Sequence, residues 1–223
     1  GKNNVHQTKK LTDEDIRYML TSNTPIYQKS EVLFGLDQAK DEIARTGEMI
    51  VVEGQFDVLA MHAAGIKNAV AASGTTFKDS HVKLFESIAG DKKKSIIFSF
   101  DPDFAGTKAA ERTYEMLRNS GIELYAVSGE SDMDPSDIYS KDNEEGLKTL
   151  IDNKMPMLEY LIERILATSN ISTVEGRFAA TKAIANLLRG VEDKGVLANL
   201  VSKYAPRLGR TDEALMDFVT KNL

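Results

Sequence analysis

The stretch at residues 49–57, Met-Ile-Val-Val-Glu-Gly-Gln-Phe-Asp, decides the fold of this chain, because an apolar run ends there in a carboxylate and a glycine. Three more short apolar runs follow, each bounded by turn residues, at 69–72, 96–100 and 124–127. Such runs are typical of strands that are buried on both faces of a parallel sheet. Helix-like stretches separate them, at 57–64, 79–89 and 106–120. This alternation predicts an α/β domain, a parallel sheet flanked by helices.

The flanking parts of the chain have a different character. A short helix is predicted at Leu36–Arg45, ended by Gly47. After residue 150 apolar residues recur at helical spacing, with no strand candidate, in segments at 155–167, 174–189, 194–204 and 212–219. We therefore expect three parts: a polar N-terminal segment at 1–34, an α/β domain at 35–151 and a C-terminal helical bundle at 152–223.

Composition excludes several kinds of site. The chain has 223 residues with 3 His and no Cys, so a disulfide scaffold, a thiolate zinc site and a cysteine nucleophile are excluded. A metal ion must be held mainly by oxygen, which favours Mg²⁺ or Mn²⁺. The apolar runs are far shorter than the roughly 20 residues of a membrane span, and no signal peptide is recognisable. We expect a cytoplasmic protein that does not contact a membrane.

The charge is unevenly distributed along the chain. A net charge of −6 is unusual for a protein that binds nucleic acid. Residues 35–151 carry 13 basic and 21 acidic side chains, whereas residues 152–223 carry 10 basic and 9 acidic ones. The excess acid therefore lies in the α/β segment, where we expect part of it to bind metal.

Carboxylates follow three of the predicted strands. Glu53 comes directly after the first strand, and Asp57 lies one helical turn further on. Asp101 and Asp103 follow the third strand two residues apart, so in an extended backbone they point to the same side. Asp134 comes after the fourth strand. Because ligands gather beyond the carboxyl ends of parallel strands, and clustered carboxylates repel one another without a cation, the pattern predicts a site for Mg²⁺ or Mn²⁺.

Simpler interpretations of these residues stay open. An Asp at a strand end beside Pro or Gly often forms only a turn or a helix cap, which applies to Asp101 or Asp134 taken alone. Asp137 is better explained as a helix cap than as a metal ligand. Lys29 and Arg17, taken alone, are solvated surface charges. What favours a metal site is the joint placement of acids at three strand ends.

Several short motifs, taken together, resemble a known family. Glu-Gly-Gln-Phe-Asp at 53–57 is the first, and others lie at 73–75, 101–106 and 134–135. They are similar to the TOPRIM signature as it occurs in bacterial DnaG-type primases. Three further regions resemble the surroundings of that signature in these primases, at 24–30 with 33–36, at 65–71 and at 171–177. The resemblance extends from about Arg17 to near the C-terminus, and its motifs are specific as a set.

The resemblance implies a DNA primase, an enzyme that makes short RNA primers on single-stranded DNA from nucleoside triphosphates, by divalent-metal-dependent nucleotidyl transfer. Matching the family motif assigns catalytic roles to Glu53, Asp57 and Asp101. It assigns metal binding to Asp101, Asp103, Asp134 and Glu53. It assigns contact with nucleotide or nucleic acid to Lys29, Arg17 and Tyr18. Whether Glu53 binds metal or acts as a general base stays open.

Three positions depart from the family pattern. Ser136 stands where a second Asp commonly follows the proline, so one metal ligand is either lost or replaced by Asp137 or Asp132. Pro102 replaces a glycine between the paired acids, and Leu20 replaces an asparagine. These changes leave the number of metal ions open.

The resemblance also implies a catalytic fragment that is weakly active in isolation, with residues 1–34 as the remnant of a basic N-terminal subdomain. Its expected partners are the template, the nucleotides and the replicative helicase of the primosome, which we expect to bind through a domain absent here. Two other functions stay open. One is another TOPRIM enzyme, a metal-dependent nuclease or topoisomerase fragment. The other is a non-catalytic replication interaction module.

Overall fold

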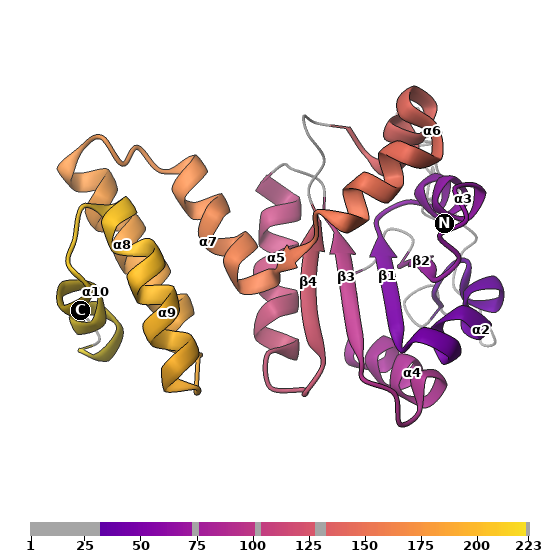
Figure 1. The fold of residues 1–223 in the computed structure, drawn as a ribbon, viewed down its shortest axis with the longest axis horizontal. Helices are drawn as coiled ribbons and strands as arrows, with labels where there is room; N and C mark the ends of the chain where they lie inside the picture. The colour runs from indigo at the N-terminus through magenta and orange to yellow at the C-terminus, as the bar shows by residue number, and fades with distance from the viewer. Residues whose placement is uncertain (1–31, 73–75, 101–103, 128–132, 222–223) are drawn as a thin grey trace, which may run out of the picture.

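The computed structural model describes residues 32–72, 76–100, 104–127 and 133–221. A five-stranded sheet with the order β2-β1-β3-β4-β5 runs through the part of the chain between residues 48 and 156 (Figure 1). Four strands are parallel: β1 (Glu48–Val52), β2 (Ala69–Ala71), β3 (Ser95–Ser99) and β4 (Glu123–Val127). The fifth, β5 (Met155–Pro156), pairs antiparallel with β4. The four strands predicted from the apolar runs are confirmed.

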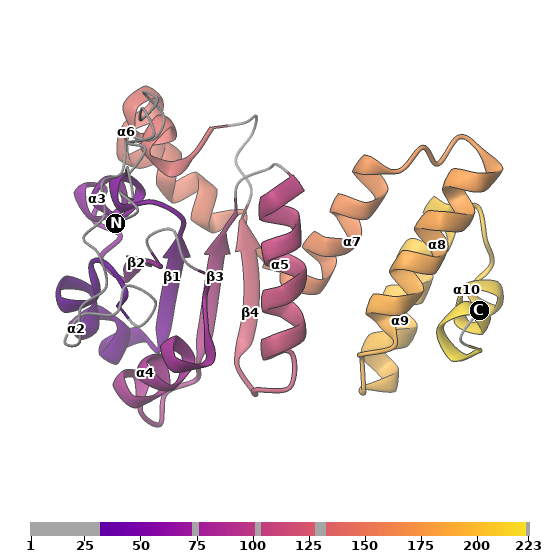
Figure 2. The same cartoon turned by 180° about the vertical axis from the view of Figure 1, so that it is seen from behind.

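Helices cover both faces of the sheet (Figures 1 and 2). The core of one face includes residues of α2 (Leu36–Thr46), α4 (Asp79–Ala89) and α5 (Phe104–Leu117). The core of the other face includes residues of α3 (Gln55–Ala63) and α6 (Pro135–Asp152). Successive residues of β1 alternate between these cores, Val51 in the first and Val52 in the second. Because both faces are buried, the strands read as unbroken apolar runs.

Gly47 ends α2 as the sequence predicts. Its φ of 74° lies in the left-handed region, which glycine adopts without strain. A Cβ atom at this position would lie 2.4 Å from the carbonyl oxygen of Lys93. Any other residue would therefore push the end of α2 away from the turn before β3.

Four helices and a short 3₁₀ turn form the bundle at the other end of the molecule (Figures 1 and 2). They are α7 (Met157–Thr168), α8 (Val174–Leu188), α9 (Lys194–Tyr204), η2 (Pro206–Leu208) and α10 (Asp212–Thr220). Thr173 and Thr211 are the N-caps of α8 and α10, since each hydroxyl accepts a backbone N–H in the first turn of its helix. None of the described helices combines the length and the apolar character needed to cross a membrane.

Tyr204 joins α9 to α7 in the interior of this bundle. The ring is fully buried, and its hydroxyl donates a hydrogen bond to Glu159 over 3.2 Å. Burial first, and then the neighbouring carboxylates of Glu159 and Glu163, raise the pKa of this hydroxyl. Lys203 pairs with Glu159 and Arg207 pairs with Glu163, so both carboxylates are neutralised beside the ring.

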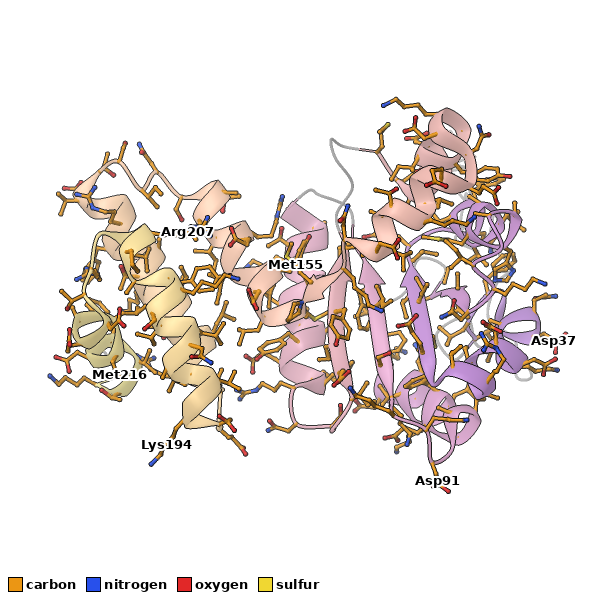
Figure 3. All side chains as sticks on the ribbon, viewed as in Figure 1. Asp37, Asp91, Met155, Lys194, Arg207 and Met216 are labelled. Carbon is orange, nitrogen blue, oxygen red and sulfur yellow. The ribbon has the colours of Figure 1, made fainter. Side chains whose placement is uncertain are left out.

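The junction between sheet and bundle differs from the prediction. We expected no strand after residue 150, yet Met155 (labelled in Figure 3) pairs with Ala126 of β4. Just before it, the Lys154 ammonium lies 2.7 Å from a carboxylate oxygen of Glu48 at the start of β1. A strand of two residues is too short to produce a periodic signal, which explains the error. The division at residues 151 and 152 stays a prediction.

Candidate functional site

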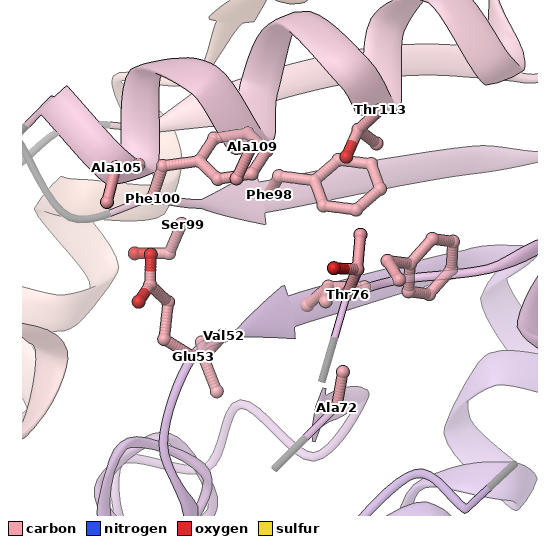
Figure 4. Close-up of a pocket in the computed structure, with 13 residues that line it drawn as sticks. Val52, Glu53, Ala72, Thr76, Phe98, Ser99, Phe100, Ala105, Ala109 and Thr113 are labelled. Carbon is pink, nitrogen blue, oxygen red and sulfur yellow. The ribbon is translucent and has the colours of Figure 1, made fainter. Parts of the chain in front are cut away.

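The first acid of the predicted site stands at the carboxyl end of β1. Val52, the last residue of the strand, is buried, whereas Glu53 is exposed. Gly54 follows with an extended backbone and precedes the first turn of α3. Figure 4 shows the Glu53 side chain extending from this turn among the residues that line a pocket. This is the end of a parallel sheet at which ligands bind.

The pocket measures about 420 Å³ and lies at the ends of β1 and β3 (Figure 4). The aromatic rings of Phe98 and Phe100 line it and stack on each other, with 5.4 Å between their centroids. The hydroxyl groups of Thr76 and Ser99 belong to the lining as well. Among the described residues around the pocket, Glu53 is the one with a charge. The pocket thus presents a single described carboxylate in an apolar and hydroxyl-bearing lining.

Asp57 lies in α3, one turn after Glu53, but its side chain is only 5% exposed. One carboxylate oxygen accepts the backbone N–H of Gly54 at 2.9 Å. The other accepts the backbone N–H of Ser136 at 3.2 Å, from a residue 79 positions further along the chain. The side chain therefore joins the turn after β1 to the beginning of α6.

Asp134 is the N-cap of α6. Its Oδ1 atom accepts the backbone N–H of Asp137 at 2.8 Å and the hydroxyl of Ser136 at 2.8 Å. Pro135 is the first residue of the helix, where its fixed φ and missing N–H cost nothing. The simpler interpretation of Asp134 as a cap is therefore confirmed, and it is compatible with metal binding through the second oxygen.

The expected role of Asp137 needs correction. We predicted that Asp137 caps a helix, but it is the third residue of α6 and its exposed side chain comes after the cap. Pro135 explains the shift, because proline at the first helical position makes the preceding Asp134 the cap. Ser136 donates its hydroxyl to Asp134 and its N–H to Asp57, so this position supports two neighbouring acids.

The remaining residues of the predicted site lie outside the described part of the chain. These are Arg17, Tyr18, Lys29, Asp101, Asp103 and Asp132. The structure therefore brings together the loops that carry Glu53, Asp57 and Asp134 and leaves the placement of the others as a prediction. Within the described ranges, no three acidic or histidine side chains lie close enough together to hold a metal ion.

The chemistry of the available donors fits a hard divalent ion. Glu53 offers an exposed carboxylate in the turn after β1. Asp134 caps α6, and hydrogen bonds of Asp57 connect the start of α6 to that turn. The chain contains no Cys, so its charged ligands are oxygen atoms, which Mg²⁺ and Mn²⁺ prefer. These residues fit the divalent metal ion that TOPRIM enzymes generally use.

Helix α7 brings two residues near this site that the sequence did not indicate. Tyr160 is buried and its ring stacks on Phe100 at 6.3 Å between centroids. Burial raises the pKa of its hydroxyl, the charge of Arg164 lowers this pKa and the charge of Glu53 raises it further. Arg164 also donates to the Thr107 hydroxyl at the start of α5, over 3.4 Å. In the sequence, both belong to an ordinary amphipathic helix, which carries no signal of this proximity.

Comparison with known proteins identifies two regions of the chain. Residues 47–128 match the family model of the Toprim domain, and residues 158–213 match that of the DnaB-helicase binding domain of primase. A DNA primase of Streptomyces coelicolor is 34% identical over 212 residues, which cover 95% of this chain and 33% of that protein. The chain thus spans about a third of the length of the curated relatives it matches.

Solved structures agree with these matches. The RNA polymerase domain of Mycobacterium tuberculosis primase DnaG, in complex with double-stranded DNA, has a TM-score of 0.74 and 31% identity, covering 86% of this chain and 61% of that one. A DnaG primase catalytic domain bound to single-stranded DNA has a TM-score of 0.68 and 26% identity, covering 91% and 64%. The chain is therefore identified as a TOPRIM-containing relative of the catalytic RNA polymerase domain of bacterial DnaG-type primases.

Proposed function

We propose that this chain carries the catalytic centre of a DNA primase, which synthesises short RNA primers on single-stranded DNA for replication in the cytoplasm. The observation that carries the proposal is the meeting of two acidic loops, after β1 and before α6, on a sheet similar to primase catalytic domains. The DNA bound in two of the similar structures supports a nucleic-acid template.

In the proposed reaction, the 3′-oxygen of the primer forms a bond to the α-phosphorus of a nucleoside triphosphate, and pyrophosphate leaves. A bound Mg²⁺ or Mn²⁺ ion lowers the pKa of the attacking hydroxyl and stabilises charge on the phosphate oxygens. Asp101, Asp103, Asp134 and Glu53 supply the carboxylates that hold the ion. The exposed Glu53 carboxylate is also available to accept the proton of the attacking hydroxyl.

Residues before the sheet complete the proposed centre. We assign contact with the nucleotide or the template to Lys29 and Arg17, since cationic side chains neutralise phosphate and supply most of the affinity for a nucleic-acid backbone. Tyr18 is assigned with them because it follows Arg17 in the matched motif. Residues 35–151 form the catalytic TOPRIM domain in this proposal, and residues 152–223 form a helical subdomain.

Synthesis of labelled RNA on a single-stranded template tests this function in the full-length protein that carries the chain. We expect short products that require template and divalent metal. Glu53→Gln keeps the size of the side chain and removes its charge, so the rate should fall roughly 10²–10⁴-fold. Asp137→Asn removes an exposed charge nearby and keeps the size of the side chain. It should change the rate by less than about twofold, as expected of a surface substitution.

Two results would redirect the assignment. Cleavage of DNA without RNA synthesis would favour a nuclease or topoisomerase-like activity of the same TOPRIM site. An equal loss in Asp137→Asn and Glu53→Gln would place Asp137 among the metal ligands, in the role that Ser136 cannot fill.

We further propose that the helical subdomain contacts the replicative helicase, a partner that we expected to bind through a domain outside this chain. The match of residues 158–213 to a DnaB-helicase binding domain supports this location. Val174 and Phe178 of α8 are 70% and 50% exposed and offer an apolar surface for such a contact.

The double variant Val174→Ser with Phe178→Ser should weaken helicase binding measured by sedimentation. The control Leu59→Ser, at an exposed residue of α3, should leave this binding unchanged. Unchanged binding in the double variant would exclude this surface.

A further inference from the structure

The motif assigns Asp57 a catalytic role, but its surroundings are those of a side chain that holds the backbone. We infer that Asp57 is a positioning residue, which fixes the loops of Glu53 and Asp134 relative to each other and so sets the geometry of the metal site. The inference rests on the proposed function, because that function supplies the reason for holding these two loops together.

The bond to Gly54 fixes the first loop. Glu53 precedes Gly54, so the peptide that joins them is held in place by the carboxylate of Asp57 through the Gly54 N–H, 2.9 Å away. An acid at the third position of a helix commonly reaches back to the N–H of the cap residue in this way. The orientation of Glu53 at the end of β1 therefore depends on Asp57.

The bond to Ser136 fixes the second loop. The first turn of α6 has few backbone N–H groups that need a partner. Pro135 carries no N–H group, and the N–H of Asp137 donates to the side chain of Asp134. The N–H of Ser136 goes to Asp57 at 3.2 Å. Asp57 thus completes the N-terminal capping of α6, the helix that begins with Asp134.

The location of the side chain separates it from the ligands. Asp57 is 5% exposed, and it is absent from the described residues that line the pocket, where Glu53 is present. Both of its oxygens face backbone N–H groups at the N-terminal ends of two helices, positions at which a negative charge is favourable. The carboxylate is therefore stabilised by the protein itself, whereas the carboxylate of Glu53 is exposed.

Loss of this bridge should act on the metal site through its geometry. A group that orients metal ligands typically contributes 10–100-fold to metal affinity or activity. Asp57→Asn retains one accepting oxygen and turns an NH₂ group toward the other N–H donor, so one of the two loops is released. We expect Mn²⁺ to bind roughly 10–100-fold more weakly in this variant.

The experiment combines Mn²⁺ binding, followed by electron paramagnetic resonance, with hydrogen exchange at the amides of Gly54 and Ser136, resolved to single residues by mass spectrometry. Asp57→Asn should weaken Mn²⁺ binding and speed exchange at one or both amides. Glu53→Gln should weaken Mn²⁺ binding and leave the Ser136 amide protected. Asp142→Asn, at an exposed acid of α6, removes the same charge away from the bridge and should change neither reading.

A second variant keeps the test decisive if Asp57→Asn does not fold. Asp57→Glu retains the charge and can still reach the Gly54 N–H as in a capping box, so faster exchange is expected at Ser136 together with weaker Mn²⁺ binding. Weaker Mn²⁺ binding with both amides protected would overturn the inference and make Asp57 a ligand. Faster exchange with unchanged Mn²⁺ binding would reduce the bridge to a structural contact. Absence of Mn²⁺ binding in the wild type would refute the proposed metal site, while amide exchange would still report on the bridge.

Discussion

At the scale of single residues, three acids of one motif set have three different surroundings. Glu53 is exposed at a pocket, Asp57 is buried between two backbone N–H groups, and Asp134 caps a helix. The sequence predicted all three at the ends of strands, because apolar runs followed by acids are a local pattern. It could not predict the burial of Asp57, since this depends on Ser136, which lies 79 positions away.

Asp134 offers a prediction that separates its two roles. Asn caps helices about as well as Asp, so Asp134→Asn should leave the free energy of unfolding within about 0.5 kcal/mol of the wild type, whereas Asp134→Ala should lower it by about 0.5–2 kcal/mol. Both variants remove the carboxylate and should slow RNA synthesis alike. Chemical denaturation and the primer assay, run on the same preparations, measure the two effects. Wild-type activity in Asp134→Asn would leave Asp134 as a cap alone.

At the scale of elements, the structure confirms the four strands of the parallel sheet. It adds β5 and the full extent of α6, of which the sequence indicated only a capping acid. The Met155–Pro156 strand is too short to show alternation, and α6 is interrupted at Asn143, whose φ of 54° departs from helical geometry. A polar helix with an internal break gives no continuous apolar stripe. Both omissions thus have the same cause, a local pattern too weak for periodicity.

Helix α7 serves both halves of the molecule, which the predicted division at residue 152 did not anticipate. Its residues Met157 and Tyr160 pack in the core of the sheet, while Ile162 and Leu166 pack in the core of the bundle. The same helix brings Arg164 against the start of α5. The amphipathic pattern of this segment predicts a helix. It does not predict that the apolar residues of this helix pack into two different cores.

At the scale of the whole molecule, the excess of acid in residues 35–151 includes the carboxylates of the proposed metal site. There, 13 basic against 21 acidic side chains give a net charge of −8. Such a surface repels bare DNA, so the template binding that we propose would depend on metal and on cations elsewhere in the protein. If the same acids hold an ion as we propose, metal should raise the free energy of unfolding of the whole domain, because an ion that binds only the folded state stabilises it.

The central claim is that carboxylates at the ends of these strands hold a divalent ion for nucleotidyl transfer. The melting temperature of the protein with and without Mn²⁺ tests it most directly. At about 100 times its dissociation constant, a bound ion adds about 2.7 kcal/mol, which corresponds to an increase of roughly 5–10 °C for a chain of this size. Our account predicts this increase for the wild type and for Asp137→Asn, and a much smaller one for Glu53→Gln. No increase in the wild type, or the same increase in Glu53→Gln, would contradict it.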